Sequence, residues 1–277
     1  MAKAINSYCN LADFLNWSSP QDTSADTTDD AVIETILEAV SRYIDDETGR
    51  KFYPTIEVRY FDTPDDREIE LDEDLLEVIS VTNADGTAVT TYDLIPKNFY
   101  PKYAIRMKKS ATVTWETNTT DYDEFSIDVS GYWGYHNNYS RRGWVSAGTL
   151  AAAISDTTTK GFTMTAGHSV AAGNIYKIDN EIFLVETVST NTITTKDRGD
   201  NGSTAATHSN GATVYEWRVM PNVALACKMI SQSVWRRFGK NSSTNDENIV
   251  LGSGVVITPR DVPTVARQTL EHLRRIY

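Results

Sequence analysis

The stretch DDAVIETILEAVSRYIDDETGRKFYP, residues 29–54, decides the fold at the N-terminal end of this sequence. Its apolar residues recur at spacings of three and four, which places them on one face of a helix. They are Ile33, Ile36, Leu37, Val40 and Ile44. Thr27, Thr28 and Asp29 are candidate N-cap residues, and Gly49 suits the position just beyond the C-terminus of the helix.

The composition excludes several classes of protein. The chain has 277 residues with 38 acidic and 26 basic side chains, a net charge of −12. This balance argues against a surface that binds nucleic acid or anionic lipid everywhere, because such surfaces need Lys and Arg. Cys9 and Cys227 form no CxxC or Cys/His cluster, so neither a disulfide framework nor a zinc site is predicted. The first residues show no basic stretch followed by an apolar run, and no run approaches the length of a membrane span, so we expect a cytoplasmic protein.

Beyond the first helix the pattern changes to strands. Residues 55–144 hold short runs rich in Val, Ile, Thr and aromatic residues, divided by turn formers such as those at 83–86, and predict a small antiparallel β domain. Residues 145–217 contain similar runs with few helix formers, and predict a second, inserted β domain, either a barrel or a sandwich.

Residues 218–277 return to helix in two pieces. The first piece has Pro221 in its first turn and Gly239 as terminator, and the second has Thr258 or Asp261 as cap. The expected buried faces are Val223, Ala226, Cys227, Ile230 and Val234, then Val262, Val265, Ala266, Leu270 and Leu273. Helices this short cannot bury their apolar faces alone. We therefore predict an α+β fold in which residues 1–54 and 218–277 form one helical core that carries the two β domains.

Charge is distributed unevenly among these four segments. Residues 1–54 carry a net −6, residues 55–144 carry −8, residues 145–217 carry −3 and residues 218–277 carry +5. Such polarity is expected where one end of a subunit meets a neighbour or another protein. The alternative is that the two ends neutralise each other inside one subunit.

Motifs that would carry chemistry are weak. An acidic cluster comprises Asp62, Asp65, Asp66, Asp72, Glu73 and Asp74. It has no EF-hand register, so we interpret it as a solvated surface rather than a Ca²⁺ or Mg²⁺ site. The sequence contains no GxSxG nucleophile elbow near a histidine, no Walker A loop and no GxGxxG after a strand. We predict no enzyme, no catalytic residue, no metal site and no cofactor.

An aromatic stretch, GYWGYHNNYSRRGW at residues 131–144, is the clearest candidate for a contact surface. Tyr, Trp and Arg are enriched both at protein interfaces and on surfaces that stack bases or sugars. Because its surroundings are acidic, we favour protein contact. The predicted patch comprises Tyr132, Trp133, Tyr135, Tyr139 and Trp144.

The two ends and the middle strands resemble a known family. LADFLNW (11–17) precedes a helix that ends in Thr48-Gly49-Arg50-Lys51-Phe52, FSIDVSGYWGY (125–135) ends in a Gly-aromatic-Gly turn, and VMPNVALACKMISQSVWRR (219–237) begins a Pro-led helix. Together with the closing segment DVPTVARQTLEHLRRIY (261–277), they are similar to the head–tail connector, or adaptor, proteins of tailed bacteriophages. The resemblance covers roughly 200 residues and leaves out 145–217, where many relatives have only a short connection.

The resemblance implies a structural virion protein, assembled in the host cytoplasm and located at the neck of the virion. Identical subunits, commonly twelve, would form a ring beneath the portal protein, extend the DNA channel and present a platform for neck or tail-completion proteins. Passing DNA would meet an acidic wall (Asp65, Asp66, Asp72, Glu73 and Asp74) that does not hold it.

The basic C-terminal region is predicted to dock to the portal or to a neighbouring subunit, because the planar fork of Arg pairs bidentately with carboxylates. Its members are Arg236, Arg237, Arg260, Arg267, Arg274, Arg275 and Tyr277. The inserted β domain is predicted to project from the outer wall of the ring as a decoration. Two rival functions are a neck stopper or tail-completion protein, and a glycan-binding module that uses Tyr176, Trp217 and the aromatic stretch.

Overall fold

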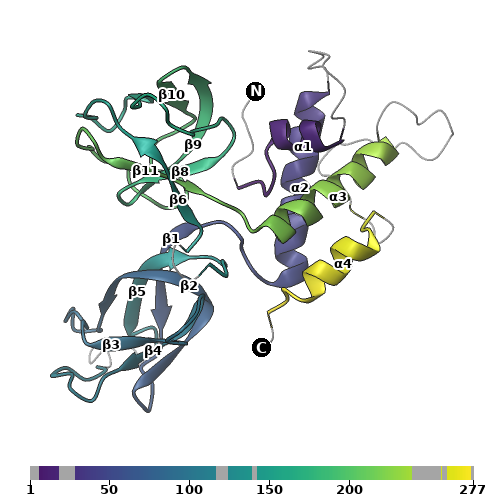
Figure 1. Ribbon diagram of the computed structural model, residues 1–277. Coiled ribbons are helices and arrows are strands. Elements are labelled where there is room, and N and C mark those ends of the chain that lie inside the picture. The colour runs from purple at the N-terminus through teal and green to yellow at the C-terminus, as the bar shows by residue number, and fades with distance from the viewer. Residues whose placement is uncertain are drawn as a thin grey trace. The chain divides into compact units, whose positions relative to one another are not determined.

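The computed structural model describes residues 6–18, 29–116, 124–138, 142–238, 257 and 261–275 (Figure 1). Within these residues the fold is mixed α+β, with four helices and two antiparallel sheets of five and six strands. The predicted class is therefore confirmed at this level.

The central helix is α2 (Asp30–Thr48), and it buries the predicted stripe Ile33, Ile36, Leu37, Val40 and Ile44. Gly49 ends it in the left-handed conformation (φ 63°), with its N–H bonded to the carbonyl of Asp45. Asp29 occupies the N-cap position without a side-chain capping bond. The other candidate caps, Thr27 and Thr28, lie outside the described residues.

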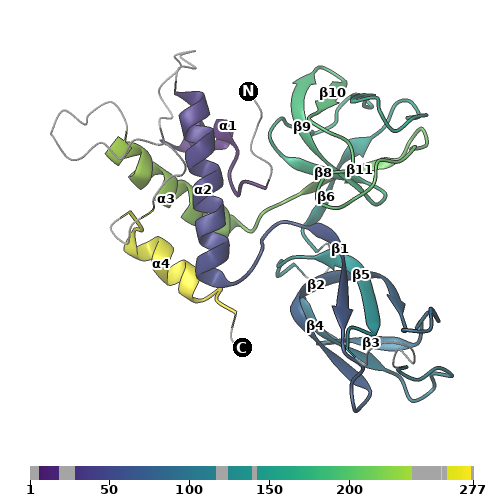
Figure 2. The same ribbon diagram turned by 180° about the vertical axis from the view of Figure 1, so that it is seen from behind.

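Three shorter helices pack on α2 and on one another: α1 (Leu11–Ser18), α3 (Pro221–Phe238) and α4 (Thr264–Glu271) (Figure 2). The predicted face of α3 is buried throughout. In α4 the prediction fails for Val265, which is 58% exposed. Val262, Ala266, Leu270 and Leu273 follow a spacing of three and four and are buried, whereas Val265 lies about 100° away from Ala266 around the helix. Pro263 is the N-cap of α4 rather than Asp261, and Thr258 lies outside the described residues.

The first sheet has the strand order β1-β5-β2-β4-β3. Its strands are β1 (Thr55–Phe61), β2 (Glu68–Thr82), β3 (Tyr92–Ile95), β4 (Lys102–Met107) and β5 (Ile127–Trp133). Phe61 pairs with Ile127 and Val81 with Val129, so these side chains share one face. That face is the core of this sheet, and Trp133 is fully buried within it.

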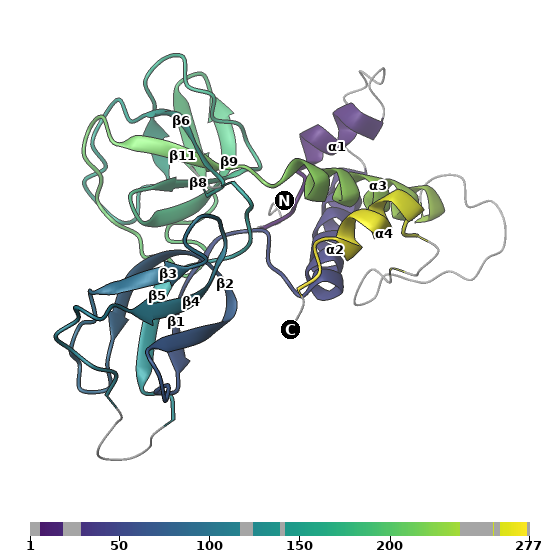
Figure 3. The same ribbon diagram turned by 60° about the horizontal axis from the view of Figure 1, so that its bottom comes forward.

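The second sheet has the order β6-β11-β8-β9-β10-β7. Figure 3 labels β6, β8, β9 and β11 of this sheet. Its strands are β6 (Trp144–Thr149), β7 (Gly161–Thr163), β8 (Ile175–Ile178), β9 (Glu181–Ser189), β10 (Thr192–Thr195) and β11 (Thr213–Trp217). The edge strands β6 and β7 approach each other only at an isolated bridge between Leu150 and Met164. The sheet is therefore not a closed barrel, and it forms one six-stranded sheet rather than two. Phe162, Tyr176 and Phe183 lie at the centre of its core.

The chain divides into two compact units. Unit 1 comprises residues 1–52, 146–200 and 204–277, and unit 2 comprises residues 53–145 and 201–203. The predicted β domain at 55–144 corresponds to most of unit 2. The helices and the inserted sheet, which the sequence analysis separated as 1–54, 145–217 and 218–277, fall together in unit 1.

Four chain segments of unit 1 meet at Tyr8 and Phe52, which are 2% and 1% exposed. The Tyr8 hydroxyl donates to the Asp45 carboxylate of α2 and accepts the N–H of Phe52 at 2.8 Å. The rings of Tyr8 and Phe52 make an edge-to-face contact with centroids 5.6 Å apart. The indole of Trp217, at the end of β11, donates to the Phe52 carbonyl at 3.0 Å. This junction joins the N-terminal segment, the end of α2, the chain leaving for unit 2 and the chain returning to α3.

The junction predicts a pH dependence of stability. Burial raises the pKa of Asp45 to about 6, although Arg42 opposes the shift, and its ordinary value is 3.8. The folded chain therefore holds this proton more tightly than the unfolded chain, and the resulting stability is present at low pH and lost as pH rises through about 6. The change is on the order of 2–3 kcal/mol.

The measurement is urea denaturation at pH 5 and at pH 7. Wild type should gain more free energy of unfolding on acidification than Asp45→Asn, whose amide does not titrate. Glu38→Gln changes an exposed acidic residue of the same helix and should keep the wild-type dependence. An identical pH dependence in wild type and Asp45→Asn would contradict the role given to Asp45.

Candidate functional site

The C-terminal arginines of the predicted docking region are partly used inside the subunit. Arg237, in the last turn of α3, pairs with the buried carboxylate of Asp261 at 2.7 Å. Arg274 pairs with the side chain of Glu47 on α2, and its Nε donates to the Glu47 carbonyl at 3.1 Å. Internal neutralisation, the alternative to docking, therefore holds for Arg237 and Arg274.

The remaining members of this region are placed as follows. Arg275 donates its backbone N–H to the carbonyl of Thr48 at 2.8 Å. Arg236 and Arg267 are exposed. Arg260 and Tyr277 lie outside the described residues.

A polar pocket of about 200 Å³ separates α2 from α4. Two arginines and two glutamates contribute to it, together with Tyr43, Val262 and Leu270. The acidic residues are Glu47 and Glu271, and the basic residues are Arg267 and Arg274. Opposite charges are balanced in this lining, so it has no net preference for an anion or a cation.

The acidic cluster separates into three environments. Asp65 and Asp66 are exposed in the turn between β1 and β2. Asp72 and Glu73 lie 2.9 and 2.8 Å from the Arg59 guanidinium. Burial alone would lower the pKa of Arg59, but these two carboxylates and Glu57 raise it.

Asp74 is 7% exposed, so its assignment to an acidic surface is wrong. Its carbonyl accepts the N–H of Gly134, and the next two residues, Leu75 and Leu76, are also buried. Three consecutive residues of β2, Asp74, Leu75 and Leu76, are therefore buried. A count of charges along the sequence does not reveal that one of these acids is inside.

The predicted aromatic patch is also wrong for the three members that are buried: Tyr132, Trp133 and Trp144. Trp133 stacks on Phe61, and its indole N–H donates to the Glu57 carbonyl at 3.1 Å. Gly131 is required there because a Cβ would lie 2.5 Å from the Glu77 carbonyl oxygen. Tyr135 is half-buried, and Tyr139 lies outside the described residues.

Two further aromatic residues, Tyr176 and Trp217, are 0% and 3% exposed, so they cannot serve as glycan-stacking platforms. Tyr176 stacks on Phe183 in the core of the second sheet, and Trp217 belongs to the Tyr8 junction. Like Tyr132 and Trp133, these two aromatic residues serve core packing rather than a contact surface.

The exposed apolar side chains of unit 2 lie elsewhere. They are Val58, Tyr60, Ile79, Phe99, Tyr103 and Phe125. Val58 and Tyr60 alternate along β1, an edge strand, on the face opposite to Phe61. The most exposed of the set are Phe125 at 70% and Phe99 at 59%.

Phe99 sits in a loop, residues 96–101, that is organised around a buried lysine. The Lys102 ammonium donates to the carbonyls of Pro96 and Phe99, the latter at 2.9 Å, and lies 4.1 Å from the centre of the Tyr100 ring. Burial lowers the pKa of Lys102. These contacts tie the backbone of the loop to Lys102, and the Phe99 side chain is left exposed. The sequence signal for it is a pair of prolines, Pro96 and Pro101, that bracket two aromatic residues.

A buried ionic network lies in the second sheet. Arg198 forms a bidentate pair with Glu181 at 2.6 and 2.8 Å, and His208 contacts the same carboxylate at 2.9 Å. Burial alone would raise the pKa of Glu181, but hydrogen bonds from Arg198, the Ala206 N–H and His208 lower it. Every one of these contacts is internal, so we assign the network to stability rather than to binding.

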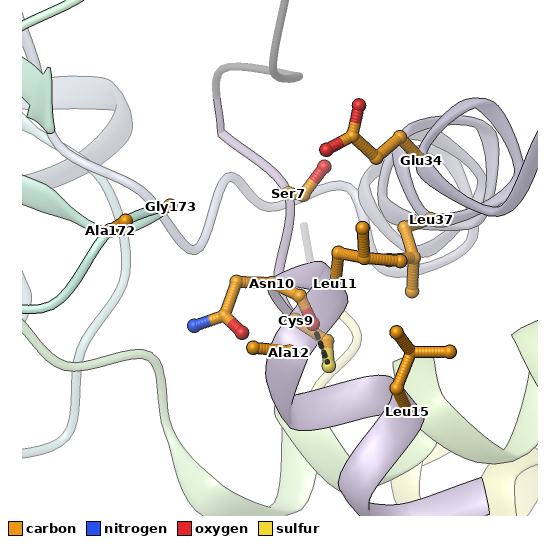
Figure 4. A pocket seen from close by; sticks show the side chains of 10 residues that line it. All are labelled: Ser7, Cys9, Asn10, Leu11, Ala12, Leu15, Glu34, Leu37, Ala172 and Gly173. Carbon is orange, nitrogen blue, oxygen red and sulfur yellow. Dashed lines mark hydrogen bonds between the residues drawn. The ribbon is translucent and has the colours of Figure 1, made fainter. Parts of the chain in front are cut away.

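An apolar pocket of about 220 Å³ lies beside α1 (Figure 4). Leu11 and Leu15 of α1, Leu37 of α2 and the turn residues Ala172 and Gly173 supply most of its wall. Polar groups come from Ser7, Asn10 and Glu34, and Cys9 also lines it. Burial raises the pKa of the Cys9 thiol, which keeps it protonated and unreactive at neutral pH.

The described residues contain no cluster of three or more His, Cys, Asp or Glu side chains suited to hold a metal ion. Within the same part of the chain, no helix is both long and apolar enough to cross a bilayer.

No family model matches this sequence, and no curated protein or solved structure matches it either.

The buried network yields a stability prediction. Glu181→Gln leaves the Arg198 guanidinium, whose side chain is 4% exposed, without its counter-charge. The free energy of unfolding should fall by about 3–5 kcal/mol. Asp197→Asn is the matched control, since Asp197 pairs with Lys160 at 2.8 Å on the surface, and should cost much less. Urea denaturation measures both, and equal small losses would contradict the assignment.

Proposed function

We propose that this chain is a structural subunit of the head–tail connector of a tailed bacteriophage, and that it acts by protein contact rather than by catalysis. The resemblance of residues 11–17, 48–52, 125–135, 219–237 and 261–277 to the adaptor family supports the proposal. The packing of α1, α2, α3 and α4 on one another is compatible with a helical connector core.

The observation that carries the proposal is the set of exposed apolar side chains on unit 2. Residues 55–144 carry a net −8, yet six large apolar side chains are at least 43% exposed among them. A monomer gains nothing from presenting Phe99 to water, whereas an interface uses such aromatic anchors. A head-to-tail contact between identical subunits closes into a ring when its rotation allows.

The portal-facing contact is assigned to the exposed arginines of the C-terminal helices. Arg236 and Arg267 remain exposed, whereas Arg237 and Arg274 hold α3 and α4 to their neighbours. Arg is suited to carboxylates on a partner surface because its fork binds both oxygens. Neck or tail-completion proteins would bind on the opposite side of the ring, and the second sheet would decorate its outer wall.

The exposed acids Asp65 and Asp66 are proposed to face the DNA channel. Like charge between this wall and the phosphate backbone lowers the residence of DNA on the wall. Asp72 and Glu73 contribute less, because Arg59 offsets their charge. Asp74 is removed from the proposed channel surface because it is buried.

Negative-stain images of the purified chain, with and without portal rings, test the proposal. We expect rings that stack coaxially on the portal, and a loss of stacking in Arg236→Glu combined with Arg267→Glu. Rings that bind tail-completion proteins but no portal would favour the neck stopper instead. A chain that stays monomeric with and without portal rings would contradict the proposal.

A second test addresses the apolar contacts. Tyr60→Ser combined with Phe99→Ser should abolish rings while leaving the circular dichroism spectrum unchanged, because both side chains are exposed. Tyr215→Ser, at a 36% exposed position of β11 in unit 1, is the control and should leave rings intact. Light scattering gives the mass of each variant. Rings that persist in the double variant would exclude these two residues from the interface.

A further inference from the structure

We propose that the subunits are joined by strand pairing, in which the edge of β1 in one copy hydrogen-bonds to the edge of β3 in the next copy. This inference rests on the proposed function for the ring and goes beyond it by naming the two strands of the joint. β1 and β3 are the two edge strands of the first sheet, and both belong to unit 2. The exposed side chains of Tyr60 and Phe99 lie on β1 and in the loop that follows β3.

The outward-facing backbone groups of β1 belong to alternate residues. Ile56 donates its N–H to the carbonyl of Asn201 at 2.8 Å, so Ile56 points away from β5. Consecutive residues of an antiparallel pair point to opposite sides, so Val58 and Tyr60 also point away from β5. Among the described residues, nothing hydrogen-bonds to the outward groups of Val58 and Tyr60. These two residues therefore present unpaired N–H and C=O groups.

The first part of the β1 edge is covered within unit 2, by the turn at residues 201–203. Gly202 lies so close that a Cβ on it would be 2.1 Å from the Ile56 carbonyl oxygen. Beyond this turn, β1 carries no lysine, proline or bulge, three of the devices that keep sheet edges from pairing. Val58 and Tyr60 are instead apolar and exposed. The second half of β1 is thus open to another strand.

The edge of β3 offers the same pattern. Lys108 donates its N–H to the carbonyl of Thr91 at 3.1 Å, so Thr91 faces β4 and the next residue faces away. The outward residues of β3 are therefore Tyr92 and Leu94, and within the described part of the chain neither has a hydrogen-bond partner on that side. Pro96 ends this edge because it has no N–H. Each edge thus carries two free residues at the same spacing.

The two faces of the sheet decide how the edges meet. Val58 and Tyr60 have their side chains on the outer face, whereas Leu94 packs against the core of the sheet. Directly opposed residues of an antiparallel pair share a face, so antiparallel pairing would turn the core of the next sheet to the outside. In parallel pairing, Leu94 bonds to Val58 and Tyr60 and lies level with Arg59. Arg59 is on the core face, over the Trp133 ring, so a parallel joint keeps the core faces continuous.

Three hydrogen bonds follow from this register. The N–H of Leu94 donates to the Val58 carbonyl, and the Leu94 carbonyl accepts the N–H of Tyr60. The N–H of Val58 donates to the Tyr92 carbonyl. The same register sets Tyr60 beside Ile95, and a pair of an aromatic and a β-branched side chain stabilises neighbouring strands.

Charge favours this joint over the pairing of two identical edges. Two antiparallel copies of β1 that used both free residues would place Arg59 opposite Arg59, and two copies of β3 would place Asp93 opposite Asp93. Like charges directly opposed destabilise a sheet. In the β1–β3 joint, Asp93 lies level with Val58 and Arg59 with Leu94, so no like charges are opposed. Contact between two different surfaces of identical subunits is the head-to-tail kind that can close into a ring.

Proline variants test each edge separately. Val58→Pro and Leu94→Pro each remove one outward N–H and place a ring in the path of the incoming strand. The sheet inside the subunit should persist, because proline is accepted on edge strands where the N–H faces outward. Light scattering should show each variant alone as a monomer with an unchanged circular dichroism spectrum. Val58→Thr and Leu94→Val keep the N–H and should assemble like wild type.

A mixture of the two proline variants identifies the joint. Each variant keeps the edge that the other has lost, so an equimolar mixture should form one-to-one dimers and nothing larger. Assembly by Leu94→Pro alone, with none by Val58→Pro, would mean that β1 pairs with β1 and would overturn the proposal. Rings formed by both proline variants would overturn strand pairing but would leave the connector function in place.

Amide hydrogen exchange tests the register in wild type, without any variant. The N–H groups of Val58, Tyr60 and Leu94 should exchange at least about tenfold more slowly in the assembled protein than in diluted monomer. The N–H of Tyr92 should not change, because it faces the Ile56 carbonyl that residue 202 covers. Mass spectrometry with electron-transfer fragmentation resolves these positions. Protection of Val58 and Tyr60 without Leu94 would assign another strand to the β1 edge and overturn the proposal.

The joint and the connector function can fail separately. Polymers that lose assembly in both proline variants but do not bind portal rings would support the joint and contradict the connector function. Wild type that stays monomeric at every concentration and with portal rings would overturn both.

Discussion

The fold of unit 1 depends on one buried hydroxyl. The Tyr8 hydroxyl accepts a hydrogen bond from the N–H of Phe52 and donates one to the Asp45 carboxylate. The N-terminal segment, α2 and the exit towards unit 2 are therefore joined through one side chain. Trp217 adds the returning chain through the Phe52 carbonyl. Buried polar groups are costly when one partner is missing, so each of these segments requires the others.

Periodicity in the sequence was enough to predict α2, α3 and α4, whereas α1 was not predicted as a helix. The stripe from Ile33 to Ile44 and the face from Val223 to Val234 are buried as expected, because a spacing of three and four leaves little alternative in a helix. Strand runs likewise predicted two antiparallel regions. Val265 shows the limit of this prediction. It is apolar and adjacent to the buried Ala266, so the sequence alone does not reveal that its side chain is exposed.

The contact residues were harder to predict. Trp133 and Phe99 are both aromatic residues near turn-forming residues, Gly134 in the first case and Pro101 in the second. Trp133 is nevertheless fully buried, whereas Phe99 is exposed. Which of them faces water depends on strand pairing and on the Lys102 ammonium within the 96–101 loop, and neither is local information. The same holds for charge, because the positive C-terminal segment includes Arg274, whose partner Glu47 is distant in the sequence.

The discontinuity of unit 1 has a consequence for biosynthesis. α2 ends at Thr48 and its main partner α3 begins at Pro221, with all eleven strands of the described fold between them. At a synthesis rate of about 5–20 residues per second, α3 emerges from the ribosome roughly 10–35 s after α2. Both sheets can be completed during that interval, while the apolar stripe of α2 still lacks α3. The nascent chain therefore matures from its middle outwards, and α2 is among the last elements to be covered.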